Sequence, residues 1–201
     1  MNSPAFASCL ASLERELAEA RVRGGYVVAR APAPSGLGLA LLRATDAVEA
    51  NAGRRVAFSP WNETDSPTGK SSFFFGLGAA VEIRAEGPER FDQARNAARA
   101  LVARLEPMSA DDPVHSIRFW GGASFASGTN ASETWREFGD ALFFVPELAY
   151  AEQNDDATFT LFALAERAPL VLERLRSLLD RLDAEEVHDV TPLNGAATTK
   201  S

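Results

Sequence analysis

The stretch formed by residues 73–150 constrains the fold of this chain more than any other part of its sequence. Two of its apolar segments, FFFGLGAAVEIRAEGPERF and FWGGASF, are punctuated by glycines, and a third, WREFGDALFFVPELAY, is rich in aromatic residues. Aromatic and β-branched residues favour strands, whereas a glycine inside such a run marks a bend, a bulge or a close approach of two backbones. These segments predict a sheet, in which residues 72–85 form one long strand that bends at Gly76 and Gly78.

Residues 89–106 have the clearest helical pattern in the chain. Arginines occupy one side of this segment, apolar residues recur on the other, and Pro107 follows as a stop signal. The predicted apolar face consists of Phe91, Ala94, Ala98, Leu101, Val102 and Leu105. The spacing or composition of the apolar residues predicts further helices over residues 5–23, 37–50 and 170–182.

The remaining apolar runs predict strands over residues 26–31, 55–59, 114–125, 141–151 and 157–165. The last two flank the polar segment EQNDD, which is typical of an antiparallel hairpin. Strands occur singly or as neighbours rather than as βαβ units, which predicts an α+β fold with a largely antiparallel sheet and helices packed on one face. We expect one domain over residues 1–184, followed by a flexible polar tail or linker over residues 185–201.

Composition excludes several classes of partner. A chain of 201 residues with 46% hydrophobic content can bury one substantial core, and its net charge of -8 argues against nucleic acids and anionic membranes as partners. The longest apolar runs fall short of the roughly 20 residues that a membrane-spanning helix needs. One cysteine cannot form an intrachain disulfide, and two histidines do not favour a clustered zinc site. We therefore expect a cytoplasmic protein.

Two glycine-containing motifs resemble parts of nucleotide-binding loops. Residues 68–72, TGKSS, match the end of a phosphate-binding P-loop, but Thr64 stands where the first glycine is needed and no helix pattern follows. The pair Gly76 and Gly78 lacks the third glycine of a dinucleotide loop, because Val81 occupies that position. We interpret the first motif as a solvated turn and the second as close backbone packing or a bulge.

No other side chains form a catalytic or metal-binding pattern. Cys9 falls near the apolar stripe of the first helix, where we expect a small buried hydrophobe, and we interpret His115 and His188 as structural or solvated. Three acidic pairs are predicted to face water: Asp111-Asp112, Asp155-Asp156 and Glu185-Glu186. Three tryptophans are predicted to fill the core: Trp61, Trp120 and Trp135. On this basis no residue of the chain is assigned a catalytic, cofactor-binding or metal-binding role.

Taken in order, several short segments resemble the N-terminal half of isochorismate synthases, which are chorismate-utilising enzymes. The resemblance covers residues 13–182 and depends on the order and spacing of these segments. They are Phe58-Ser59-Pro60-Trp61, Phe75-Gly76-Leu77-Gly78-Ala79-Ala80, Gly87 with Arg90-Phe91, Gly121-Gly122-Ala123-Ser124-Phe125, Trp135 with Phe138, and Phe144-Val145-Pro146 with Tyr150. We expect all of them to be scaffold residues, with Trp135, Phe138 and Phe143 or Phe144 adding bulk to the core.

The resemblance implies an isomerase that converts chorismate to isochorismate for menaquinone or siderophore biosynthesis. In such enzymes a lysine base, a glutamate acid and carboxylate-held Mg²⁺ act together, and all of these groups belong to the C-terminal half. The only lysines here are Lys70, in a polar turn, and Lys200, next to the end of the sequence. We therefore expect a shortened, scaffold part of an isochorismate synthase that is inactive alone and needs a chorismate-binding catalytic half as its partner.

A second hypothesis remains open from the sequence. The chain could instead serve as a non-enzymatic binding or regulatory module that keeps the scaffold and associates with a separately encoded partner. The two hypotheses differ in whether a catalytic half is required for its function.

Overall fold

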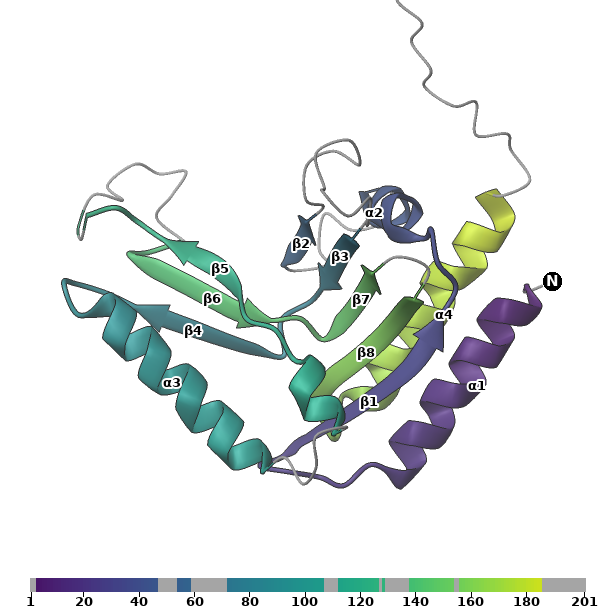
Figure 1. The fold of residues 1–201 in the computed structure, drawn as a ribbon, viewed down its shortest axis with the longest axis horizontal. Helices are drawn as coiled ribbons and strands as arrows, with labels where there is room; N and C mark the ends of the chain where they lie inside the picture. Colours follow the sequence, from purple (N-terminus) through teal and green to yellow (C-terminus); the bar gives the residue numbers. More distant parts are fainter. Residues whose placement is uncertain are drawn as a thin grey trace, which may run out of the picture.

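The computed structural model describes residues 3–46, 54–58, 72–106, 112–126, 128, 138–153 and 156–185, which form an α+β fold with two antiparallel sheets (Figure 1). The helices are α1 (Pro4–Glu19), α2 (Gly38–Asp46), α3 (Arg90–Leu105) and α4 (Ala168–Glu185), with a short 3₁₀ helix, η1 (Pro113–Ser116). The strands are β1 (Tyr26–Ala33), β2 (Arg55–Phe58), β3 (Ser72–Leu77), β4 (Val81–Ala85), β5 (Trp120–Ala123), β6 (Ala141–Val145), β7 (Leu148–Gln153) and β8 (Asp156–Leu164). The predicted fold class is confirmed.

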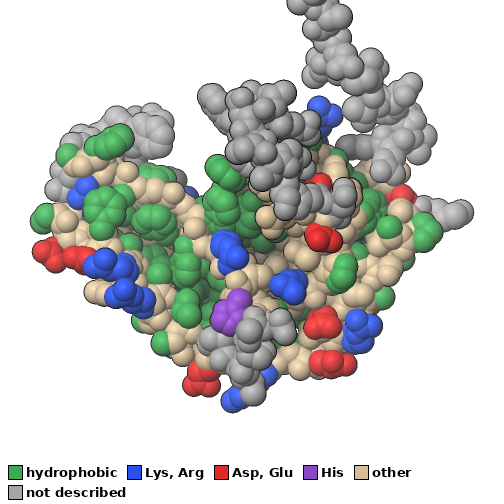
Figure 2. Space-filling model, viewed as in Figure 1, with side chains coloured by type: hydrophobic (Ala, Val, Ile, Leu, Met, Phe, Trp, Pro, Cys, Tyr) green, Lys and Arg blue, Asp and Glu red, His purple; other side chains and the backbone are tan. Residues whose placement is uncertain are grey.

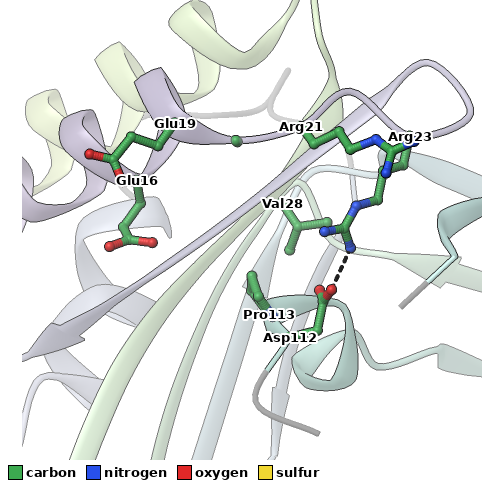
Figure 3. A pocket seen from close by; sticks show the side chains of 8 residues that line it. Glu16, Glu19, Arg21, Arg23, Val28, Asp112 and Pro113 are labelled. Atoms are coloured by element: carbon green, nitrogen blue, oxygen red, sulfur yellow. Dashed lines mark hydrogen bonds and ion pairs between the residues drawn. The ribbon is translucent and has the colours of Figure 1, made fainter. Parts of the chain in front are cut away.

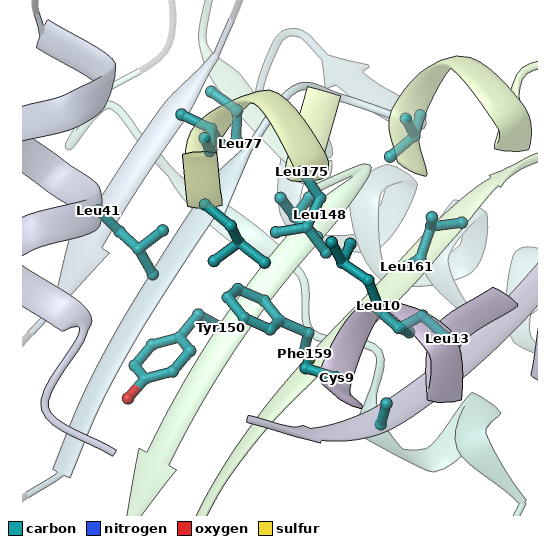
Figure 4. Packing of buried hydrophobic residues seen from close by; sticks show 14 of the residues in the cluster. Cys9, Leu10, Leu13, Leu41, Leu77, Leu148, Tyr150, Phe159, Leu161 and Leu175 are labelled. Atoms are coloured by element: carbon teal, nitrogen blue, oxygen red, sulfur yellow. The ribbon is translucent and has the colours of Figure 1, made fainter. Parts of the chain in front are cut away.

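The larger sheet has five strands in the order β1-β8-β7-β3-β2, and its main core lies between one face and helices α1, α2 and α4. Side chains of a strand alternate between the two faces, so β7 and β8 send Leu148, Tyr150, Phe159 and Leu161 into this core (Figure 4). The helices contribute leucines such as Leu13, Leu41 and Leu175. Each fully buried leucine or phenylalanine contributes about 2 kcal/mol through the removal of apolar surface from water.

The smaller sheet has three strands in the order β4-β6-β5, and α3 packs on β4 and β6. A second cluster joins the two sheets, because Leu101 and Leu105 of α3 and Val145 of β6 meet Val28 and Phe162 on the opposite face of the larger sheet. In Figure 1, α3 and the smaller sheet form the left part of the molecule and the larger sheet with α1 and α4 forms the right part. Helix α3 thus covers a different face from α1, α2 and α4.

The long bent strand predicted over residues 72–85 is wrong, because the segment forms β3 and β4 in different sheets. The chain turns between them at Gly78, which has a φ of 74°. The expected close packing at Gly76 is confirmed, since a Cβ atom there would lie 2.6 Å from Cγ of Pro146 and 2.8 Å from Cγ1 of Val56.

Two further predicted strands are also divided. Residues 114–125 begin in η1 rather than in a strand, because Pro113 starts a helical turn and the Asp112 carboxylate accepts a hydrogen bond from the Val114 N–H group. Residues 141–151 form β6 and β7, which belong to different sheets and separate at Pro146 and Glu147. The predicted hairpin is confirmed for β7 and β8, which pair in antiparallel register.

The predicted helices all occur, with shifted ends. Helix α1 ends at Glu19 rather than at residue 23, and β1 continues through Pro32, which an edge strand tolerates because its outer side has no ladder bond to lose. The predicted apolar face of α3 is partly wrong: Phe91 is 56% exposed, whereas its neighbour Arg90 is buried. The Arg90 guanidinium lies 4.6 Å from the centre of the Phe91 ring.

Candidate functional site

Several of the sequence-predicted residues lie outside the described part of the chain. They are residues 68–71 of the TGKSS motif, both lysines, His188, Trp61, Trp135, Asp111, Asp155 and Glu186. Residues 186–201 of the predicted polar tail also lie outside it. Within the described ranges, no helix combines the length and apolar character that crossing a membrane requires.

Cys9 and His115 can be placed. Cys9 is buried in the main core on α1, and burial raises the pKa of its thiol to about 11. The thiol therefore stays protonated near neutral pH, which confirms its predicted role as a small hydrophobe. His115 lies exposed on η1, so the strand predicted for it is wrong.

Asp112 was predicted to face water and is instead buried. Its side chain is 3% exposed, and its Oδ2 lies 2.7 Å from Nη1 of Arg23, whose side chain is 16% exposed. These two residues are 89 positions apart in sequence, so no local pattern could have revealed the pair. A carboxylate removed from water needs such a partner, because an unpaired buried charge is strongly unfavourable.

Two more carboxylates are buried and fully engaged inside the protein. Oδ2 of Asp140 accepts a 2.8 Å hydrogen bond from the Gly87 N–H group, and Oδ1 accepts one of 2.8 Å from Gly128. These two bonds, together with the charge of Arg90, hold the pKa of Asp140 below its ordinary value. Arg90 itself donates to the carbonyl oxygens of Gly87, Ser124 and Phe125, so the cluster closes the loops at one end of the smaller sheet.

Glu147, in the connection between β6 and β7, carries the second of these buried carboxylates. Its Oε1 lies 3.0 Å from Nη2 of Arg167, and its Oε2 lies 3.1 Å from Nη1 of Arg174 on α4. In the described ranges, no three acidic, histidine or cysteine side chains come together as a possible metal site. The described residues therefore do not fit the Mg²⁺ that the family resemblance implies, since their buried carboxylates already face arginines or backbone N–H groups.

A cavity of about 260 Å³ lies at the C-terminal end of α1 (Figure 3). Glu16 and Glu19 form one side of it, and Arg21 and Arg23 approach it from the segment that leads into β1. Val28, Ala20, Asp112 and Pro113 complete the lining. The cavity thus combines charges of both signs with a small apolar surface.

Aromatic side chains from β2, β3 and β5 bring the two sheets together. Trp120 stacks on Phe74 with ring centres 4.1 Å apart, and Phe58 lies 6.0 Å from Trp120, which agrees with a packing role for Trp120. Phe58 remains 53% exposed, and the indole Nε1 of Trp120 is buried without a hydrogen bond in the described part of the chain. Figure 2 shows hydrophobic side chains on the surface of the molecule near the hollow between the two sheets.

Comparison with known proteins identifies the family to which this chain belongs. Residues 58–199 match the model of a family described as chorismate binding enzyme. The fold is similar to that of MenF, the menaquinone-specific isochorismate synthase from Escherichia coli, with a TM-score of 0.52 and 19% sequence identity. The likeness covers 87% of this chain and 34% of the MenF chain, so this chain spans about a third of that enzyme's length. No curated protein matches the sequence.

The structural likeness, at this identity, concerns the fold: helices and antiparallel sheets in a common arrangement. The family match shows more than the fold, because a single family model matches well over half of the residues, including the segments from β3 to α4. It confirms the relationship that the order of glycine-rich and aromatic segments indicated. The chain therefore belongs to the chorismate binding enzyme family.

Proposed function

We propose that this chain is the N-terminal scaffold part of an isochorismate synthase-like isomerase, and that it does not convert chorismate to isochorismate alone. One observation carries the proposal. The buried carboxylates Asp112, Asp140 and Glu147 each face arginine or backbone donors of the same chain, so they hold the fold together and are not available for acid–base chemistry. Family membership supplies the reaction class.

The chemistry would then come from a chorismate-binding half that lies outside residues 1–201. That half would hold the Mg²⁺, which would anchor the substrate when bound. The exposed ring of Phe58 beside Trp120 supports contact with such a partner, since apolar surface and open sheet edges favour association. The complete enzyme would act in the cytoplasm, in menaquinone or siderophore biosynthesis.

An activity assay tests the first part of the proposal. The purified chain is incubated with chorismate and Mg²⁺, and isochorismate is measured by chromatography. We expect no product above the enzyme-free background. Turnover by this chain would overturn the proposed scaffold role, because it would require catalytic groups among its own residues.

Association with a catalytic half tests the second part of the proposal, the need for a partner. The DNA that follows the codon for Ser201 is expected to encode a strand with a lysine and a helix with glutamates, and co-expression with that segment should give isochorismate synthase activity. Phe58→Asp should weaken the association at least about tenfold, because it would bury a charge at the contact. Phe91→Asp, at an equally exposed position on α3, is the matched control and should leave the association unchanged.

The cavity at the end of α1 favours a second candidate function, a non-enzymatic binding or regulatory module. Such a module would be monomeric and would unfold cooperatively without a catalytic half. Sedimentation and urea unfolding of the isolated chain separate the two functions. Aggregation that disappears on co-expression with a catalytic half would support the scaffold role over the module.

A further inference from the structure

We draw no further inference here: the strongest candidate, the exposed apolar patch that Phe91 and Phe125 form around the buried Arg90 at one end of the smaller sheet, carries none because nothing in the described part of the structure shows what covers it.

Discussion

The carboxylate of Glu147 lies 3.1 Å from the guanidinium of Arg174, and this contact joins the connection between β6 and β7 to helix α4. Glu147 is only 4% exposed in its side chain, and Arg167 approaches its other oxygen from the turn before α4. The chain leaves the smaller sheet and enters the larger one at this residue. The ion pair therefore fixes the junction between the two sheets relative to the helix that covers the larger one.

Arg174→Met should lower the free energy of unfolding by about 3 kcal/mol, because it leaves a buried carboxylate with one exposed partner. Arg176→Met is the matched control: Arg176 lies on the same helix and pairs with the exposed Glu14 and Glu173, so its loss should cost less than about 1 kcal/mol. Urea unfolding followed by circular dichroism measures both. Equal midpoints for the two variants would contradict a special role for the Glu147 contact.

Local sequence pattern was sufficient to predict which segments are helices and that β7 and β8 form a hairpin. Helices α3 and α4 have strong helical periodicity in their apolar residues, and the polar residues between β7 and β8 mark a turn. Local sequence pattern was not sufficient to assign the strands to their sheets. The apolar runs across Gly78 and Pro146 look continuous, and their division depends on which distant strand each half pairs with.

The candidate site was less predictable than the fold. The cavity depends on Arg23 and Asp112, which are 89 residues apart in sequence, and on the place where α1 happens to end. The acidic pair of residues 111 and 112 has the composition of a solvated turn, and only the tertiary structure buries Asp112. A buried charge pair of this kind has no local signature, because each partner is an ordinary polar residue in its own segment.

Gly121→Ala should destabilise the protein by about 3 kcal/mol. Gly121 has a φ of 154° in β5, and a Cβ atom there would overlap the backbone carbonyl oxygen of Leu142 in the paired strand β6, which cannot move without breaking the ladder. Gly36→Ala is the control, since Gly36 has a φ of 79° but open space around it, and should cost about 1–2 kcal/mol. In thermal unfolding, Gly121→Ala should have a clearly lower unfolding temperature than Gly36→Ala. The reverse order would contradict the close approach of β5 to β6.

Cys9 should react with a thiol reagent only when the protein unfolds. At pH 8, a thiol with a pKa of about 11 is ionised in only about one molecule in a thousand, and the core excludes the reagent as well. With Ellman's reagent, we expect no colour in native buffer over an hour and one equivalent of thiol in urea, with a midpoint that follows the loss of helix signal. Rapid labelling of the native chain would show that α1 detaches from the core.

Asp140 should make stability fall as the pH is lowered. Because Gly87 and Gly128 hold its folded pKa below the ordinary value of 3.8, the unfolded chain binds the proton more tightly, and the stabilisation that is complete above that value is lost as pH falls through the folded pKa. The unfolding free energy of the wild type should therefore decline more steeply than that of Asp140→Asn between about pH 5 and pH 2. Asp180→Asn, which removes an exposed carboxylate on α4, is the control and should follow the wild type. Parallel profiles for wild type and Asp140→Asn would show that the hydrogen bonds from Gly87 and Gly128 do not persist in solution.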